Sequence, residues 1–273
     1  MACQGLSKET LNEITLVKIG GSVITEKRNP FTALNEVIDR LSSEICSARK
    51  LSRSKIILGN GGGSFPHVFA EKFQVQKGIV GGGGSKGFSL VQNSAANLNR
   101  IVVDSLICHG EDAVSISPSS CVMAESSRVR SWDMEIIKKM LAINLLPVIY
   151  GDVVIDIKQG FSIVSTEELL FYLAKSLNVK RVIIGTNVDG VIDYSTNKKY
   201  DIITSSDRPW VMNFVKGSNA VDVTGGMKSK VDVLLRLAED KGVESEIINA
   251  MKPGFLECAI KGQKGLGTII RNA

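Results

Sequence analysis

The sequence of 273 residues has few aromatic side chains and no long apolar run. Aromatic residues make up 5% of the chain, and no segment approaches the roughly 20 consecutive apolar residues that a membrane-spanning helix needs. The first fourteen residues mix Lys8, Glu9 and Glu13 with polar side chains, unlike a signal peptide. We therefore expect a cytoplasmic protein without a membrane partner. Because hydrophobic residues make up 44% of the chain, a mainly disordered protein is also excluded.

Paired cysteines and dense basic segments are also missing. The 5 cysteines lie far apart and form no C-x-x-C pair, which indicates neither a disulfide framework nor a thiolate zinc site. We predict no metal site built from side chains. Lysine and arginine number 33 against 28 aspartates and glutamates, a net charge of +5. This mild excess does not favour a nucleic-acid partner, but it suits a small anionic ligand if several lysines converge on one pocket.

Short β-branched runs alternate with longer amphipathic segments. Buried strands are predicted at residues 14–19, 55–58, 113–116, 146–149 and 181–184. Apolar residues at spacings of three and four predict helices over residues 35–48, 89–108, 133–143 and 166–177. This order predicts an α/β fold with an open, mainly parallel sheet sandwiched by helices. We place a boundary between two lobes after residue 177, where a predicted helix ends.

Glycine clusters follow two of the predicted strands. The first is residues 18–22 (KIGGS), and the second is residues 60–67 (NGGGSFPH). Glycine lets the backbone turn sharply at these points and bring its N–H groups against an anion. The apolar periodicity after the second cluster predicts a helix whose free N–H groups face the same crevice. Two such loops at the carboxyl ends of strands predict a phosphate cradle. Plain tight turns are the alternative.

A third glycine cluster lies at residues 222–230 (DVTGGMKSK). Thr224 predicts a helix N-cap, and Lys230 lies off the apolar stripe that begins at Met227. At this position Lys230 would contact an anion bound at the start of the helix. The alternative is that Lys230 is a solvated surface lysine. The first two clusters match neither the Walker A pattern nor the G-x-G-x-x-G fingerprint with its acidic partner. This disfavours P-loop NTPases and Rossmann dehydrogenases.

Four segments together resemble one protein family. They are residues 18–22, 61–67, 186–191 (TNVDGV) and 222–230, while residues 117–120, 146–156 and 265–270 also fall in the expected order. Over nearly its whole length the chain resembles the amino acid kinase family, and within it the branch that acts on isopentenyl phosphate. The resemblance implies an acceptor-binding lobe of residues 1–177 and a nucleotide-binding lobe of residues 178–273.

The resemblance also implies roles for the charged residues. Lys18 neutralises charge on the transferred phosphoryl group, Lys230 holds the ATP phosphates, and Lys27 reaches the same region. Glu167 is the acidic residue that orients Lys18 and Lys230. Since phosphoryl transfer depends mostly on positioning and charge stabilisation, lysines, backbone amides and magnesium suffice without a general base.

Glycines and loop residues complete the implied site. Backbone N–H donors come from Gly20, Gly21, Gly62 and Gly63. The nucleotide is bordered by Ser22, Thr186, Asn187, Asp189, Gly190, Val191, Gly225 and Gly226. Thr166 lies beside the acceptor.

His67 distinguishes branches of the family. The branches whose acceptor is already a phosphate or phosphonate resemble this chain in having a histidine here. A histidine early in a glycine-led helix donates a hydrogen bond to an acceptor phosphate, more strongly when it is protonated. The alternative is a structural histidine, which we prefer for His109 near the end of a predicted helix.

Several positions depart from the pattern usual in the isopentenyl phosphate branch. Thr166 and Glu167 stand in place of glycine and aspartate, Asn187 in place of aspartate, Asn60 in place of histidine, and Pro66 in place of glycine. None of these changes removes a lysine or His67. We therefore expect altered affinity or substrate range rather than loss of activity.

The resulting prediction is an ATP- and magnesium-dependent kinase that converts isopentenyl phosphate to isopentenyl diphosphate in isoprenoid synthesis. The isoprenyl tail is expected in an apolar pocket of the first lobe, beside the helix that contains Phe88. The resemblance also suggests a homodimer. Two alternatives remain: a kinase for another small phosphate or phosphonate, fosfomycin included, and a non-catalytic nucleotide-binding sensor on the same fold.

Overall fold

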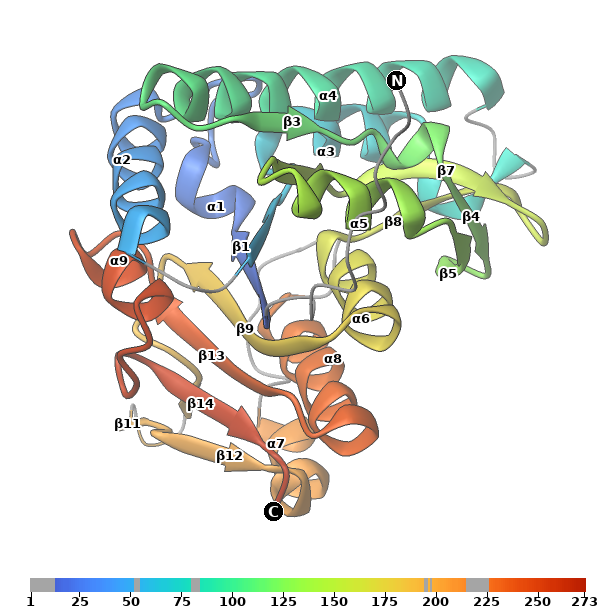
Figure 1. The fold of residues 1–273 in the computed structure, drawn as a ribbon. Helices are drawn as coiled ribbons and strands as arrows, with labels where there is room; N and C mark the ends of the chain where they lie inside the picture. The colour runs from blue at the N-terminus through green and yellow to red at the C-terminus, as the bar shows by residue number, and fades with distance from the viewer. Residues whose placement is uncertain (1–12, 52–54, 80–83, 194–195, 197, 215–225) are drawn as a thin grey trace, which may run out of the picture.

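The computed structural model describes residues 13–51, 55–79, 84–193, 196, 198–214 and 226–273. Its centre is an eight-stranded sheet in the order β12-β14-β13-β9-β1-β2-β6-β3 (Figure 1). In that order the strands are Ile202–Thr204, Thr268–Arg271, Glu244–Asn249, Val179–Thr186, Ile14–Ile19, Lys55–Asn60, Leu146–Tyr150 and Ala113–Ser115. Neighbouring strands are parallel except for β13 and β14, which confirms the predicted α/β fold with a mainly parallel sheet.

Helices cover both faces of this sheet (Figure 1). One face packs against α1 (Gly21–Ile24), α2 (Asn35–Leu51), α4 (Gly84–Cys108) and α9 (Phe255–Ile260). The other packs against α5 (Glu135–Ala142), α6 (Thr166–Ser176), α7 (Arg208–Phe214) and α8 (Gly226–Lys241). In β1, Val17 and Ile19 belong to the first core and Ile14 and Leu16 to the second. Since side chains alternate along a strand, Lys18 points to the face covered by α6 and α8.

A smaller four-stranded sheet lies beside the amino-terminal part of α4, in the order β5-β4-β7-β8. Its strands are Arg128–Trp132, Val122–Glu125, Asp152–Asp156 and Gly160–Val164. Val91 of α4 packs against Val153 and Phe161 of this sheet, and the Phe88 and Phe161 rings lie 5.8 Å apart. The sequence analysis did not predict these strands, because they are short and two of the four lack a continuous run of three apolar residues.

The remaining elements are short. Helix α3 spans Ser64–Lys72, and β10 (Ile192–Asp193) pairs with β11 (Lys198–Lys199). Single turns of 3-10 helix lie at Val75–Lys77, Pro118–Ser120 and Ser205–Asp207. Among the described residues, no helix has the length and apolar character that crossing a membrane requires.

Helix α4 begins five residues before the predicted start at residue 89. Gly84 and Gly87 disfavour a helix on local propensity. A Cβ atom at Gly87 would lie 2.9 Å from the Cβ of Phe73, so the close packing of α4 against the segment after α3 requires a glycine there. Tertiary packing therefore extends the helix beyond its predicted start.

The expected lobe boundary falls between α6 and β9 and interrupts no element. The main sheet nevertheless continues across it, because β9 pairs with β1 along the whole length of β1. In Figure 1 most blue to green elements lie at one end of the molecule and most orange and red elements at the other, but the red α9 packs against the blue α2. The division into an acceptor lobe and a nucleotide lobe stays a prediction.

Parallel pairing decides where the loops meet. Strands β2, β1, β9 and β13 run in the same direction, so their carboxyl ends share one edge of the sheet. The segments that follow these strands include both strand-following glycine clusters and residues 186–191. This carboxyl edge is where an open α/β sheet binds its ligands.

Candidate active site

The first two glycine clusters are in direct backbone contact. A Cβ atom at Gly21 would lie 2.2 Å from the backbone nitrogen of Gly63, and one at Gly61 would lie 2.6 Å from that of Gly21. The Gly61 N–H donates to the carbonyl of Ile19 over 2.8 Å. Any larger residue at these points would separate the two loops. The glycines therefore form one continuous backbone surface at the carboxyl ends of β1 and β2.

Helix α3 starts from this surface. Gly63 precedes the helix with a φ of +54°, a conformation that favours glycine. The Ser64 N–H donates to the Thr25 hydroxyl over 3.1 Å, and this hydroxyl donates to the carbonyl of Gly21 over 2.9 Å. Thr25 thus joins the two glycine loops, a role that the sequence analysis did not assign.

His67 is the fourth residue of α3 and is half-buried. It therefore lies in the first turn, whose backbone N–H groups have no partner within the helix. Pro66 is compatible with this turn because the third N–H of a helix needs no such partner. A Cβ atom at Gly62 would lie 2.3 Å from Cγ of Pro66, so Pro66 packs on the glycine loop.

Three charged residues from distant parts of the chain meet beside the glycine loops. The buried ammonium of Lys18 donates to the carboxylate of Glu167, the second residue of α6. Nζ of Lys230, near the start of α8, lies 3.8 Å from the same Glu167 oxygen. It also donates to the carbonyl of Gly226 over 3.3 Å.

The protonation state of this group follows from its charges. Burial opposes ionisation of Glu167, but the charges of Lys18 and Lys230 outweigh burial and hold the pKa of Glu167 below its usual value. One carboxylate therefore faces two ammonium groups, and the group has an excess of positive charge. An anion that approaches Lys18 and Lys230 would balance this charge.

Thr166 and Asn60 connect α6 to the sheet. The Thr166 hydroxyl donates to the backbone carbonyl of Asn60 over 2.8 Å. A Cβ atom at Gly59 would lie 2.7 Å from Cγ2 of Thr166, so the threonine methyl fills the space above that glycine. The fully buried Asn60 side chain accepts a hydrogen bond from Asn99 of α4 over 2.8 Å. Both residues are thus integrated into the packing behind the glycine loops.

The segment after β9 is held in a defined conformation. The Thr186 hydroxyl lies 3.0 Å from the carbonyl of Val188 and 3.1 Å from that of Ile248. Gly190 has a φ of +142°, and the Val191 N–H donates to the Thr268 hydroxyl over 2.8 Å. These bonds tie residues 186–191 to β13 and β14.

Asp189 accepts two side-chain hydrogen bonds, one from the last residue of β13 and one from the segment that follows it. Nζ of Lys252 lies 2.7 Å from its carboxylate, and Nδ2 of Asn249 lies 2.8 Å from it. These hydrogen bonds hold the pKa of Asp189 below its usual value. The negative charge of Asp189 is therefore compensated by Lys252, so it repels a bound anion less than an isolated carboxylate would.

Comparisons with known proteins bear on this site. The sequence profile described as the amino acid kinase family matches residues 13–249. The chain belongs to the amino acid kinase family. Isopentenyl phosphate kinase of Methanothermobacter thermautotrophicus is 39% identical to it over 269 residues, which cover 93% of this chain and 98% of that protein. The enzyme of the same name from Methanocaldococcus jannaschii is 36% identical over 228 residues, 81% of this chain and 86% of that protein.

A solved structure with the same name as these relatives has a similar fold. A crystal structure of isopentenyl phosphate kinase superposes on this amino acid kinase with a TM-score of 0.80 at 35% identity. The superposition covers 94% of this chain and 100% of that chain. Together with the profile match, this confirms the family resemblance drawn from the four sequence motifs.

Several of the expected site residues of this amino acid kinase lie close together in the structure, and others do not. Lys18, Glu167 and Lys230 meet, and the Ser22 hydroxyl lies 3.5 Å from Oδ1 of Asn187, which brings the first glycine loop to residues 186–191. Lys27 is exposed on the segment between α1 and α2. Gly225 lies outside the described residues, whereas Gly226 is the first residue of α8.

The sequence analysis missed four contributors to this site. Thr25 and Asn99 support the glycine loops, and Asn249 and Lys252 hold Asp189. Asn249 and Lys252 lie at and just after the end of a β-branched run, so a search for polar residues following every strand would have found them. Thr25 and Asn99 carry no comparable signal, because their roles depend on contacts between elements.

Proposed function

We propose that this amino acid kinase transfers the γ-phosphoryl group of ATP to isopentenyl phosphate and forms isopentenyl diphosphate. The observation that carries the proposal is the buried Lys18–Glu167 pair, with Lys230 near the same carboxylate, beside two glycine loops in backbone contact. The two relatives that share 39% and 36% of their aligned residues with this chain are both named isopentenyl phosphate kinase. The charged residues of the site and the names of these relatives both support phosphoryl transfer to isopentenyl phosphate.

The acceptor phosphate binds at the start of α3. Backbone N–H groups of Gly62 and Gly63 face it, and the His67 imidazole donates a hydrogen bond to it. The position of His67 in the first turn supports this assignment, because helix N-termini favour anions. Protonation of His67 would strengthen the contact. Thr166 holds the loop behind the acceptor through its bond to Asn60.

The transfer step needs charge stabilisation rather than a base. An oxygen of the acceptor phosphate attacks the γ-phosphorus of ATP, and the bond from that phosphorus to the bridging oxygen breaks as ADP leaves. Lys18 neutralises the charge that spreads over the transferred group, and Lys230 holds the phosphates of ATP. Glu167 keeps both ammonium groups in place. A preorganised donor of this kind contributes about 3 kcal/mol to transition-state stabilisation.

Residues 186–191, Gly20, Gly21, Ser22 and Gly226 border the nucleotide. The contact between Ser22 and Asn187 supports this, since it closes the first glycine loop against the segment after β9. The left-handed φ of +59° at Gly226 lets α8 start close to a phosphate. Lys27 reaches the same region from its exposed segment when ATP is bound.

Magnesium accompanies the nucleotide. In the described part of the chain, no cluster of three or more His, Cys, Asp or Glu side chains could hold a metal ion. Magnesium in kinases is bound largely by phosphate oxygens and water, with one or two carboxylates. The described residues fit such an ion, because the Glu167 carboxylate lies beside the two lysines that would contact the phosphates. The ion would neutralise charge on the ATP phosphates.

The isoprenyl tail occupies apolar surroundings in the first lobe. The cluster of Ala70, Val75, Val91, Val153 and Phe161 lies between α3, α4 and the smaller sheet, and Phe69, Phe73 and Phe88 pack against it. Helix α3 contributes both His67 and Phe69, so the cluster is next to the proposed acceptor phosphate. Rearranged aromatic side chains of this cluster would accommodate a short branched tail.

A homodimer through the first lobe is also proposed. Met123 of β4 and Ile155 of β7 are register partners, and both are exposed, as is Ile157. This apolar surface would be covered by a second copy. Sedimentation of the wild-type chain and of the Ile155→Lys variant tests it, since loss of the contact halves the mass. The cytoplasmic location expected from the sequence stays a prediction.

An acceptor panel tests the proposed function. Purified protein is supplied with ATP, magnesium and one acceptor at a time: isopentenyl phosphate, fosfomycin, or an alkyl phosphate without the alkene. ADP release is coupled to NADH oxidation, and the product is identified by mass spectrometry. We expect turnover to be fastest with isopentenyl phosphate. Preference for another acceptor would move the assignment to that acceptor, and binding of ATP without any turnover would favour a sensor.

A further inference from the structure

Helix α2 is joined by charged side chains to the segment that follows β13. The guanidinium of Arg40 donates to the carboxylate of Glu44, one turn further along α2, over 2.5 Å. The same guanidinium donates to the backbone carbonyl of Ala250 over 2.8 Å. Ala250 directly follows β13 and lies 210 positions after Arg40 in the chain. Arg40 therefore connects residues before the expected lobe boundary with residues after it.

Glu44 holds the same segment at a second place. Its buried carboxylate accepts hydrogen bonds from the N–H groups of Gly254 and Glu257 over 3.0 and 3.3 Å, at the start of α9. A carboxylate at this position satisfies N–H groups that have no partner within the helix. Arg40 and Glu44 together hold the chain between Ala250 and the first turn of α9.

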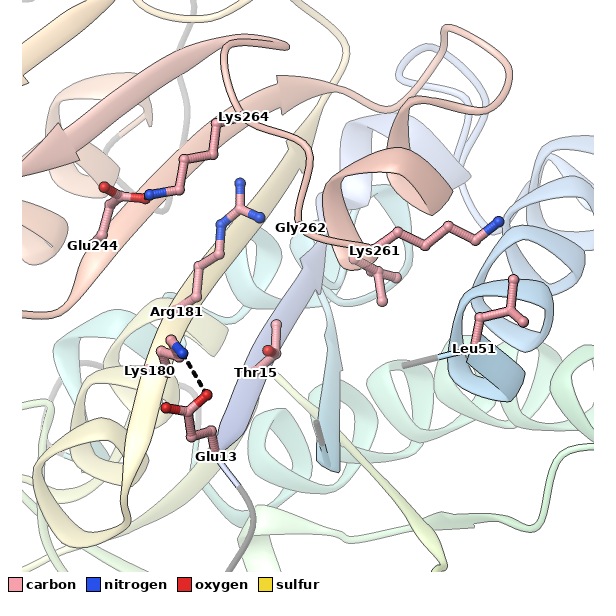
Figure 2. Close-up of a pocket in the computed structure, with 10 residues that line it drawn as sticks. Glu13, Thr15, Leu51, Lys180, Arg181, Glu244, Lys261, Gly262 and Lys264 are labelled. Atoms are coloured by element: carbon pink, nitrogen blue, oxygen red, sulfur yellow. Dashed lines mark hydrogen bonds and ion pairs between the residues drawn. The ribbon is translucent and has the colours of Figure 1, made fainter. Parts of the chain in front are cut away.

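The other end of α9 is also held by a buried charge. Arg181 of β9 donates to the backbone carbonyls of Ala259 and Gln263 over 2.8 and 3.1 Å, and it pairs with Glu246. Figure 2 shows the Arg181 guanidinium directed toward the chain near Gly262. In Figure 1, α9 lies beside α2, against which it packs. Since α9 is held at both ends, a shift of the segment before it is not absorbed by movement of the helix.

The segment after β13 in turn holds residues 186–191. The Ala250 N–H donates to the carbonyl of Thr186 over 2.8 Å. The Asp189 carboxylate is held by the last residue of β13 and by Lys252, as described above. A continuous series of direct contacts therefore leads from α2 to the residues that border the proposed nucleotide site.

We propose that Arg40 is a positioning residue for nucleotide binding. Its guanidinium fixes the backbone of Ala250 from the side of α2, and this keeps Thr186 and Asp189 where they border ATP. This role rests on the proposed function, in which residues 186–191 contact the nucleotide. A preformed site loses less conformational freedom on binding, so loosening it weakens affinity without removing a contact to the ligand.

The two contacts of Arg40 depend on the shape of its guanidinium. The planar group carries its donors in a fixed fork, so one side chain reaches both the Glu44 carboxylate and the Ala250 carbonyl. A lysine has the same charge but a compact ammonium group. Arg40→Lys should therefore keep a cation beside Glu44 and weaken the bridge to Ala250. The variant separates loss of position from loss of charge.

Arg49 provides a matched control on the same helix. Its guanidinium pairs with Glu111 and donates to the backbone carbonyl of Asn144 over 3.2 Å. These partners precede β3 and β6, at the amino edge of the main sheet and away from residues 186–191. Arg40 and Arg49 thus make the same two kinds of contact, to a carboxylate and to a carbonyl, from different halves of α2.

Calorimetric titration with a non-hydrolysable ATP analogue tests the proposal. We expect Arg40→Lys to weaken binding about tenfold, as for loss of a hydrogen bond from a charged donor that holds the binding geometry. Arg49→Lys should stay within about twofold of wild type. Urea unfolding should show similar losses of stability in both variants. In the coupled ADP assay, Arg40→Lys should raise KM for ATP and leave kcat and KM for isopentenyl phosphate within about twofold.

A double-mutant cycle shows whether Arg40 acts through Asp189. Asp189→Ala removes the carboxylate that the segment after β13 holds. If Arg40 acts along this series of contacts, the two substitutions are not additive. In the Asp189→Ala background, Arg40→Lys should therefore weaken binding of the ATP analogue by less than about threefold.

Two results would overturn the proposal. One is equal affinity for the analogue in Arg40→Lys and Arg49→Lys, which would make the Arg40 contacts purely structural. The other is a full tenfold effect of Arg40→Lys in the Asp189→Ala background, which would place its action elsewhere. Both comparisons concern nucleotide binding alone, so they hold whichever acceptor is phosphorylated. Failure of the wild-type chain to bind the analogue would instead overturn the proposed function, and this role with it.

Discussion

The two edges of the main sheet hold their charged residues in different ways. At the carboxyl edge, Lys18 and Glu167 are buried and Lys230 is 3.8 Å from the same carboxylate. At the amino edge, Lys180 and Lys264 form pairs that are largely exposed. Buried charges interact strongly and hold a fixed geometry, whereas exposed pairs exchange with water and ions. The contrast explains why only the first edge is preorganised for chemistry.

The largest expected effect is that of Lys18→Met on catalysis. The substitution removes the charge beside the transferred phosphoryl group, and we expect kcat to fall about 10³-fold. It also leaves Glu167 buried with only the more distant Lys230, which should destabilise the fold by about 3 kcal/mol. Steady-state kinetics and urea unfolding measure both effects. A kcat within tenfold of wild type would contradict the role given to the carboxyl edge.

His67→Ala tests the acceptor side of the same edge. Loss of a charge-assisted hydrogen bond should raise KM for isopentenyl phosphate about 10- to 100-fold and change KM for ATP less than about threefold. The matched control is His109→Ala, which removes a histidine whose Nε2 lies 2.9 Å from Asp39 on the surface. Equal KM values for both variants would remove His67 from the acceptor site.

Asp156 provides a third arrangement, a buried carboxylate held by neutral donors. Burial raises its pKa, but hydrogen bonds from Ser127, Lys158, Ser162 and Ser126 outweigh this and lower the pKa to about 2. The unfolded state therefore binds the proton first as pH falls, and the stabilisation present above pH 4 is lost toward pH 2. The destabilisation caused by Asp156→Asn should shrink by about 2 kcal/mol over this range.

This prediction is measured by urea unfolding of wild type and Asp156→Asn between pH 5 and the lowest pH at which both remain folded. Ile143→Thr, a substitution of an exposed residue outside the proposed dimer surface, serves as a control without a titrating group. A difference between wild type and Asp156→Asn that is independent of pH would show that the carboxylate is not ionised preferentially in the folded state.

The double substitution Thr166→Gly with Glu167→Asp recreates the pair usual in the isopentenyl phosphate branch. It removes the bond from Thr166 to Asn60, worth about 1 kcal/mol, and shortens the acid that faces both lysines. We expect kcat/KM to stay within about tenfold of wild type. A loss above a hundredfold would show that the longer acid is needed to reach Lys18 and Lys230 in this chain.

The smallest effect is expected at the amino edge. Lys180→Ala removes an exposed pair with Glu13, so the free energy of unfolding should change by less than about 1 kcal/mol and kcat by less than about twofold. Chemical denaturation and the coupled ADP assay check this. A large loss of activity would mean that the two edges are not functionally distinct.

Local patterns made much of the fold predictable. The strands β1, β2, β6 and β9 were expected from β-branched runs, because a strand buried on both faces must be apolar throughout. The smaller sheet was not expected, since strands such as Arg128–Trp132 lack that signal. The early start of α4 was also missed, because Gly87 is required by contact with Phe73 and not by helix propensity.

The candidate site also combines features that local sequence patterns predict with contacts that they do not predict. Its glycine loops follow from the sequence, since glycine after a buried strand lets the backbone turn sharply and approach a neighbouring loop. The group of Lys18, Glu167 and Lys230 was expected only through resemblance to a family. The bonds of Thr166 to Asn60 and of Lys252 to Asp189 join residues whose proximity depends on helix placement and strand order.

The amino-acid sequence by itself determined a mainly parallel α/β sheet with glycine loops at the carboxyl ends of two strands, because periodicity, β-branching and glycine act over a few neighbouring residues. The tertiary structure decided which carboxylate neutralises which lysine, both where Lys18 meets Glu167 and at the far edge, where Lys180 of β9 meets Glu13 (Figure 2). Those pairings depend on β9 lying between β1 and β13. Strand order brings together residues more than a hundred positions apart, and no local pattern encodes it.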